Sequence, residues 1–183
     1  MVTDLRRPVF ADVNLAKSVL RSLLSHETLD SLRLRAFTLM PDHLHLLAGV
    51  KDTTETLPSL IGFVKSYTTQ QYWKRSSEII QTGQVVLPST LVTKSTVKES
   101  HSLLSALLAS RATLRPEVVE LKNWPHVQAE HFLQKRLWQT RFFDHVIRND
   151  FDLRENLDYI AMNPVRAGYV TRPQFYPYTG FLL

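Results

Sequence analysis

The fold of this chain is decided by residues 37–50, which read FTLMPDHLHLLAGV. Two apolar runs flank a Pro-Asp pair, and such a pair between apolar runs is typical of a turn. The pattern predicts an antiparallel hairpin whose second strand begins with His-Leu-His. Because side chains alternate between the two faces of a strand, His43 and His45 are expected on one face and Leu44 on the other.

The two histidines of this strand have two interpretations. Imidazoles one residue apart on one strand face can converge on a divalent metal ion. The alternative is a pair of ordinary, partly exposed strand histidines, and a bare His-x-His pattern does not decide between them. A second stretch, residues 159–170, bears on the choice because it carries a tyrosine and an asparagine at helical spacing.

Composition narrows the class of protein. The 183 residues are 44% apolar, which is ordinary for one globular domain with a proper core. The lack of cysteine excludes disulfides, thiolate catalysis and cysteine zinc sites, so any metal ligand must be histidine, carboxylate, amide or water. Without a run of ~20 apolar residues or a signal-peptide core, a cytoplasmic location and no membrane partner are expected. The net charge of +5 favours a polyanionic partner without identifying it.

Further helices and strands are predicted on both sides of the hairpin. Residues 12–26 have apolar positions at helical spacing behind Asp12, a suitable N-cap. Residues 32–40 alternate as the first strand of the hairpin. Residues 1–10 are expected to form the frayed end of a strand, either because that strand is very short or because its start is truncated. A second helix is expected over about 58–75, with Thr56 as its N-cap.

Residues 76–132 carry no recognisable chemistry, and we treat them as an insertion lying against the main domain. Short strands are expected at 85–87 and 91–92, and a helix is expected at 102–112. Residues 116–121 are ambiguous. The insertion therefore separates the hairpin and second helix from the last elements of the chain.

Two elements are predicted after the insertion. Residues 133–148 are rich in aromatic and β-branched side chains, which favours a strand. Asn149 then caps a third helix with an apolar face. This helix is expected to end near Asn163, because Pro164 disfavours helical conformation at the residue before it.

Basic and aromatic side chains occur together in the second helix and in the stretch that follows the insertion. In the helix, Lys65, Lys74 and Arg75 are interleaved with Tyr67, Tyr72 and Trp73. Such mixtures can hold a single nucleic-acid strand by phosphate contact and base stacking, whereas the alternative is that the aromatic residues are core and the basic ones face water. The candidate DNA-binding residues are Arg7, Lys65, Trp138, Gln139, Arg141 and Arg148.

The third helix places two functional side chains on one face. Tyr159 and Asn163 are four residues apart, so they lie one above the other. A phenol with a pKa near 10 is a weak nucleophile, but it becomes competent beside a metal-activated phosphate. The amide oxygen of Asn163 can be the third ligand of an ion held by His43 and His45. Oxygen and imidazole ligands with open positions suit Mg²⁺ or Mn²⁺.

Several motifs of this chain occur together in an order that resembles the single-tyrosine HUH transposases, and within them the REP-associated tyrosine transposases. The motifs are MPDHLHLL (40–47), LWQ (137–139), FFDHVIRN (142–149), DYI (158–160) and NPVRAG (163–168). The second helix agrees more loosely. The combination is far more specific than any one motif.

The resemblance implies a fold and a catalytic site. The fold would be α+β and ferredoxin-like, one domain over residues 1–183, with an antiparallel sheet, helices on one face and the insertion before the last core strand. His43 and His45 would be the metal ligands, Tyr159 the nucleophile and Asn163 an additional ligand, with Mg²⁺ or Mn²⁺ as cofactor.

The resemblance also implies a substrate and a reaction. The substrate would be single-stranded DNA, typically a hairpin next to a short conserved tetranucleotide in a repetitive extragenic palindrome. The protein would be nucleoid-associated in a bacterial cytoplasm. The tyrosine would cleave a phosphodiester through a 5′-phosphotyrosine and transfer the strand. A monomer and a homodimer both fit, as does action of the tyrosine on either subunit's metal site.

Two other function classes are considered beside the strand transferase. One is a module of the same fold that binds DNA hairpins without cleaving them. The other is an unrelated metallohydrolase built on His-x-His, which the sequence disfavours because Leu47 stands where a third alternating histidine would be needed.

Overall fold

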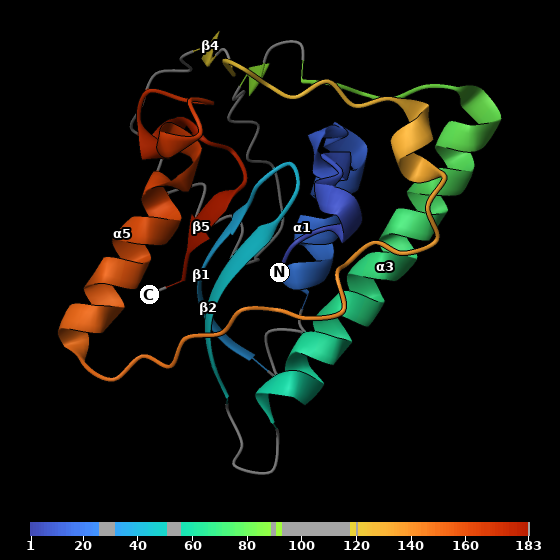
Figure 1. The fold of residues 1–183 in the computed structure, drawn as a ribbon. Coiled ribbons are helices and arrows are strands. Elements are labelled where there is room, and N and C mark those ends of the chain that lie inside the picture. The colour runs from blue at the N-terminus through green and yellow to red at the C-terminus, as the bar shows by residue number, and fades with distance from the viewer. Residues whose placement is uncertain (26–31, 51–55, 89–90, 93–117, 120, 183) are drawn as a thin grey trace.

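The computed structural model of the protein describes residues 1–25, 32–50, 56–88, 91–92, 118–119 and 121–182 (Figure 1). The helix expected at 102–112 lies outside these residues. At the centre is the predicted hairpin, in which β1 (Leu32–Leu39) pairs antiparallel with β2 (Leu44–Val50). The other edge of β1 pairs with β5 (Thr179–Phe181), so the strand order is β2-β1-β5.

Beyond β2, the sheet continues through two isolated bridges rather than through full strands. Val2 pairs with His43, and Thr3 pairs with Trp138. The backbone N–H of Gln139 also donates to the carbonyl of Val2 at 3.0 Å. The start of the chain therefore lies between the beginning of β2 and residues that come more than a hundred positions later.

Three α-helices are present in the described part of the chain: α1 (Val13–Leu23), α3 (Leu57–Thr82) and α5 (Asp150–Arg166). Their predicted caps, Asp12, Thr56 and Asn149, each accept a hydrogen bond from the backbone N–H three residues further on. None of these helices is long and apolar enough to cross a bilayer. The remaining elements are short: β3 (Leu91–Val92), β4 (Val118–Val119) and 3-10 turns at Asp4–Arg6, Val9–Ala11, Ala129–Phe132 and Pro173–Phe175.

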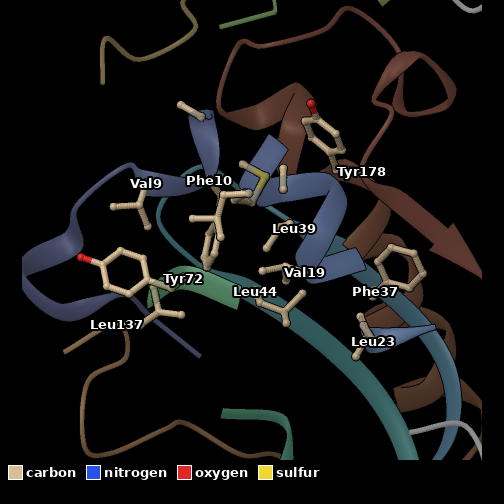
Figure 2. Packing of buried hydrophobic residues seen from close by; sticks show 14 of the residues in the cluster. Val9, Phe10, Val19, Leu23, Phe37, Leu39, Leu44, Tyr72, Leu137 and Tyr178 are labelled. Atoms are coloured by element: carbon tan, nitrogen blue, oxygen red, sulfur yellow. The ribbon is translucent and has the colours of Figure 1, made fainter. Parts of the chain in front are cut away.

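One face of the sheet carries the apolar core. Phe37, Leu39 and Leu44 are on this face and pack with Val19 and Leu23 of α1, as Figure 2 shows. α3 packs against α1, and Figure 1 shows both helices on the same side of the sheet. A bulge between residues 34 and 36 of β1 shifts the pairing register by one residue. The bulge breaks the simple alternation of the sequence and turns the side chain at position 34 toward the core.

The opposite face of the sheet carries α5. Thr38 and His45 are paired on this face, and α5 contacts both β1 and β2. The α+β class and the antiparallel sheet are thus confirmed. The helices were expected on one face of the sheet, and α1 and α3 do share a face. α5 instead covers the opposite face, because the partly apolar surface of α5 packs against the paired strands of the hairpin.

The strand expected at 133–148 was a wrong prediction. Apart from the bridge at Trp138, these residues form no strand, and they run from beside α3 to the start of α5. The sheet edge offers only the first residues of the chain as a partner, so pairing stops after Gln139. Phe143 and Val146, which suggested a strand, are 91% and 69% exposed.

The third helix also ends later than predicted. α5 continues through Pro164 to Arg166, and Gly168 then adopts a left-handed conformation with φ of 73°. The N–H of Gly168 donates to the carbonyl of Val165, and the N–H of Tyr169 donates to the carbonyl of Pro164, both at 2.9 Å. This C-terminal motif satisfies the last carbonyls and offsets the hydrogen bond that proline cannot donate.

Parts of the segment 76–132 belong to the main body of the protein. α3 continues to Thr82, and Val127 and Phe132 join the apolar core. β3 and β4 pair antiparallel as two-residue strands, which confirms the strand expected at 91–92. The strand expected at 85–87 is absent, and those residues follow α3 without regular structure.

Two buried tyrosines give a matched test of hydrogen bonding in the core. The hydroxyl of Tyr176 donates to the carbonyl of Leu39 at 2.9 Å, whereas the hydroxyl of Tyr178 has no partner among the described residues. Tyr176→Phe is expected to lower the free energy of unfolding by about 1–2 kcal/mol, because it leaves a buried carbonyl unpaired. Tyr178→Phe is expected to be neutral or slightly stabilising. Urea denaturation measures both, and equal losses for the two variants would contradict the structure.

Candidate functional site

The two histidines of the hairpin lie side by side at the start of β2. His43 occupies the bridge to Val2, and His45 pairs with Thr38 of β1. Their ring centroids are 4.8 Å apart, and the ring planes are nearly perpendicular, at 88°. The alternation that placed both imidazoles on one face is therefore correct.

His43 is oriented by its neighbour Asp42, which the sequence assigned only to the turn. The Asp42 Oδ1 atom lies 2.6 Å from the His43 Nδ1 atom. A neutral imidazole that donates from Nδ1 keeps its Nε2 lone pair for a ligand, and carboxylate partners of this kind commonly orient metal-binding histidines. Burial raises the pKa of Asp42, but the hydrogen bond from His43 and the charges of His43 and Arg6 outweigh it, so the pKa lies below its usual value.

His45 is held neutral by its surroundings. Burial, and then the charge of His43, lower the pKa of His45 to about 4. Its Nε2 atom is buried and has no hydrogen-bond partner in the described part of the protein. Because an unpaired buried nitrogen is costly, this atom is suited to accept a ligand.

Tyr159 projects from α5 toward the histidines. Its ring lies 5.3 Å from the ring of His45, again nearly perpendicular, and the residue is 46% exposed. The guanidinium of Arg166, two helical turns further on, lies 5.3 Å from the centre of the same ring. The phenol is therefore flanked by an imidazole and a cation while it remains open to solvent.

Asn163 lies one helical turn after Tyr159. Its side-chain nitrogen donates to the backbone carbonyl of Tyr159 at 2.7 Å. This bond uses the amide nitrogen and leaves the amide oxygen as the group that can accept or coordinate. The structure thus brings His43, His45 and Tyr159 together, with Asn163 beside the tyrosine on the same helix.

The donor set limits how a metal ion could be held. Within the described ranges, no three His, Cys, Asp or Glu side chains gather in one place. Two imidazoles would therefore need oxygen ligands of another kind, such as the Asn163 amide, water or a phosphate. The unpaired Nε2 of His45 and the oriented ring of His43 fit such an ion, with positions left for a substrate.

Two of the predicted DNA contacts are instead buried, which corrects the prediction. Arg7 is 6% exposed and donates to the hydroxyl of Tyr72 and to backbone carbonyls, including those of His131 and Arg136. Trp138 is 4% exposed, and its indole N–H donates to the hydroxyl of Thr68 at 2.8 Å. No pattern in the sequence indicates that this arginine donates to backbone carbonyls rather than to phosphates.

The other four candidates remain accessible to different degrees. Lys65 is half-buried, and its ammonium donates to the carbonyls of Gln139 and Thr140 at 2.7 and 3.1 Å. The side chains of Gln139, Arg141 and Arg148 are exposed. These three can reach a ligand, whereas Lys65 first of all holds the neighbouring backbone.

Comparison with known proteins gives the family. Residues 1–99, more than half of the chain, match the family model described as "Transposase IS200 like". The chain belongs to the IS200-like transposase family. This confirms the resemblance of the hairpin motif, which lies inside the matched range. No solved structure matches the chain.

Two curated relatives carry more specific names. A "Putative REP-associated tyrosine transposase" of Haemophilus influenzae is 25% identical over 146 residues, which are 80% of this chain and 57% of the relative. A "REP-associated tyrosine transposase" of Escherichia coli K12 is 45% identical over 47 residues, which are 26% of this chain and 28% of the relative. The chain therefore spans little more than half the length of the first relative.

The buried imidazole predicts a pH dependence of stability in the metal-free protein. The folded-state pKa of His45 is lowered from 6.5 to about 4, so within this window the unfolded chain binds a proton that the folded chain does not. Stability is expected to fall as the pH decreases from 6.5 to 4, by no more than about 3 kcal/mol from this residue. Urea denaturation with a chelator present measures it.

His45→Asn serves as the control for this pH dependence, because it removes the titrating group and keeps a polar side chain. The difference in stability between the wild-type protein and the variant should shrink across the same window. Curves that run parallel from neutral to acidic pH would show that His45 is not buried in its neutral form.

Proposed function

We propose that this protein is a metal-dependent endonuclease and strand transferase that acts on single-stranded DNA with Tyr159 as nucleophile. The observation that carries the proposal is the contact of the Tyr159 ring with the His45 ring, which itself contacts His43. Segments far apart in the sequence supply these three side chains. Membership of the IS200-like transposase family supports the same reaction class.

The two imidazoles and the Asn163 amide oxygen would hold one Mg²⁺ or Mn²⁺ ion. When bound, such an ion acts as a Lewis acid on a phosphate oxygen. The chain itself contributes His45 in its neutral form and the Asp42 carboxylate, which keeps the ring of His43 in one orientation. Both features prepare the ligands before an ion arrives.

The chemical step is a transesterification. The Tyr159 oxygen attacks the phosphorus of a DNA phosphodiester, so an O–P bond to tyrosine forms while the bond to the 3′ oxygen breaks. The phenol loses its proton, and the departing 3′ oxygen gains one. The product is a 5′-phosphotyrosine and a free 3′-hydroxyl. Because the bond energy is kept in the adduct, a 3′-hydroxyl of another strand can reverse the step without a nucleotide cofactor.

Arg166 is proposed as a positioning residue for this step. Its guanidinium contacts the face of the Tyr159 ring, which restricts the rotation of the ring and places positive charge where the phosphate must approach. The residue is exposed, so a DNA phosphate can reach it. Asn163 and Arg166 follow Tyr159 by one and two turns of the same helix, so both lie on the side of α5 that carries the tyrosine.

The proposed substrate is a single-stranded DNA hairpin from a repetitive palindrome. The net charge of +5 and the exposed basic residues near α5 suit a polyanion. The names of the two relatives point to repetitive extragenic palindromes for those proteins, and we extend this substrate class to the present chain. A bacterial, nucleoid-associated setting and action as a monomer or homodimer belong to the same proposal.

Replacement of the phenol tests the nucleophile. Tyr159→Phe should lower formation of a denaturation-resistant protein–DNA adduct by roughly 10³-fold or more, because the reacting atom is lost. Hairpin binding should be retained. The assay uses single-stranded palindromes labelled at either end, with Mg²⁺ or Mn²⁺. The 3′ label should enter the adduct, and the 5′ label should appear in a shortened free fragment.

Tyr67→Phe is the matched control, because it removes a hydroxyl from α3 at a position outside the site. It should form adduct like the wild-type protein. Hairpin binding without any adduct by the wild-type protein, with either metal, would favour the non-cleaving binding module over the transferase.

Arg166 gives a second test. Arg166→Gln should slow adduct formation roughly 2- to 30-fold, which corresponds to the loss of one cation–π contact and a nearby charge. Arg166→Lys should recover part of the rate, since it restores the charge without the planar group. Single-turnover rates at saturating DNA measure the effect. Equal rates in all three proteins would remove Arg166 from the site.

A further inference from the structure

We propose that the groove between α3 and residues 135–140 is a second binding site for single-stranded DNA, with Trp73 as a stacking platform and Lys135 and Arg136 as phosphate contacts. The choice of DNA as the polymer rests on the proposed function. The residues of the groove are separate from His43, His45 and Tyr159.

The groove has walls of different origin. One wall is α3, which contributes Lys65, Thr69 and Trp73, and the other is the extended stretch 135–140. Its volume is about 560 Å³, which lies within the range of ordinary ligand sites. An elongated ligand such as a nucleotide chain can lie between the two walls.

The charge of the lining is of one sign. Lys65, Lys135 and Arg136 contribute to it, and no aspartate or glutamate does. The Lys65 ammonium is bound to the carbonyls of the opposite wall, while the side chains of Lys135 and Arg136 are exposed. The groove therefore offers two accessible cations and a third that stiffens it, which complements a phosphate backbone.

Trp73 provides a surface for a base. It is 53% exposed, although a tryptophan usually buries its large apolar area. Its indole N–H donates to the carbonyl of Lys135 at 2.9 Å, which fixes the ring across the groove. Trp73 has no aromatic ring contact within the described residues. A fixed and partly open aromatic ring is suited to stacking on an unpaired base, so the expected ligand is single-stranded.

Hydrogen bonds from buried side chains hold the backbone of the wall formed by residues 135–140. The hydroxyl of Tyr72 donates to the carbonyl of Gln134 at 2.7 Å, and Arg7 donates to the carbonyl of Arg136. With these carbonyls bound to core donors, the exposed side chains at 135 and 136 are presented to solvent from a held backbone. A wall that is already ordered loses little entropy when it binds a ligand.

The groove lies close to the tyrosine site. Gln139 lines the groove and is hydrogen-bonded to Val2, which in turn pairs with His43. Two strand spacings, roughly 10 Å, thus separate the backbone of the groove from that of the first histidine. Tyr159 and α3 lie on opposite sides of the sheet, so a DNA strand that passes Tyr159 would reach the groove around the sheet edge at Trp138. The groove would then hold nucleotides that flank the cleaved bond.

Binding of an unstructured oligothymidylate to the full chain tests the groove directly. An oligonucleotide of about 20 nucleotides exceeds a typical single-strand site, and fluorescence anisotropy measures its affinity. Trp73→Leu should weaken binding about 5- to 100-fold through lost stacking, whereas Trp73→Phe should keep most of the affinity. The double change Lys135→Gln and Arg136→Gln should reduce the slope of log affinity against log salt by about 1.4.

Lys17→Gln is the matched control, because Lys17 is an exposed lysine on α1 and does not line the groove. It should leave both the affinity and the salt slope unchanged. Circular dichroism and thermal unfolding verify that the variants fold. Unchanged affinity in Trp73→Leu and in the double variant would overturn the inference, as would tighter binding of oligouridylate than of oligothymidylate.

The adduct assay separates this inference from the proposed function. Tyr159→Phe should bind oligothymidylate like the wild-type protein, because the tyrosine is outside the groove. If the wild-type protein forms no adduct but Trp73→Leu loses affinity, the groove stands and the transferase fails. If adduct forms and no groove variant changes affinity, the groove falls and the transferase stands.

Discussion

The structure depends on the register of the central hairpin, in which Thr38 pairs with His45 and Leu39 pairs with Leu44. This pairing puts the two leucines into the core and the imidazole on the face that α5 covers. A slip of one residue would exchange the faces, burying both histidines in the core and removing them from Tyr159. Leu39 and Leu44 are almost fully buried, and each contributes roughly 2–3 kcal/mol to the correct register. The geometry of the site is therefore enforced by packing on the other side of the sheet.

The same packing leaves one polar atom of the site without a protein partner. Among the side-chain nitrogen and oxygen atoms of the described residues, only His45 Nε2 and the Tyr178 hydroxyl are buried and unpaired. Desolvating a nitrogen in this way costs about 1–3 kcal/mol. The unpaired nitrogen lies next to His43 and Tyr159. A ligand that binds the neutral imidazole would remove this desolvation cost. α5 completes the site, since its cap at Asn149 and its end at Gly168 fix the turns that carry Tyr159.

The sequence predicts well wherever a local rule decides the outcome. Alternation placed His43 and His45 on one face, the caps marked the helix starts, and the four-residue spacing placed Asn163 beside Tyr159. It failed where tertiary contacts decide. Arg7 is of a residue type that commonly contacts phosphates, but here it is buried. Its guanidinium donates instead to backbone carbonyls more than a hundred positions further along the chain. The prediction of a strand at 133–148 was wrong because no partner strand extends along these residues. The β-propensity of a segment does not show whether such a partner exists.

The groove beside α3 exists because residues 133–148 do not pair with a neighbouring strand. Backbone carbonyls must be paired, and residues 131–140 have a strand partner at only a few positions. Side-chain donors take the place of that partner: Ser76 binds the carbonyl of Phe132, and Lys65 binds the carbonyl of Gln139. Tyr72, Trp73 and Arg7 bind carbonyls between these two. α3 thus replaces a neighbouring strand, and because a helix with side-chain donors is wider than a strand, space remains between it and the backbone that it holds. The same donors hold the backbone of Lys135 and Arg136, whose side chains remain exposed beside the groove. One set of hydrogen bonds therefore orders this stretch and also positions its charged side chains.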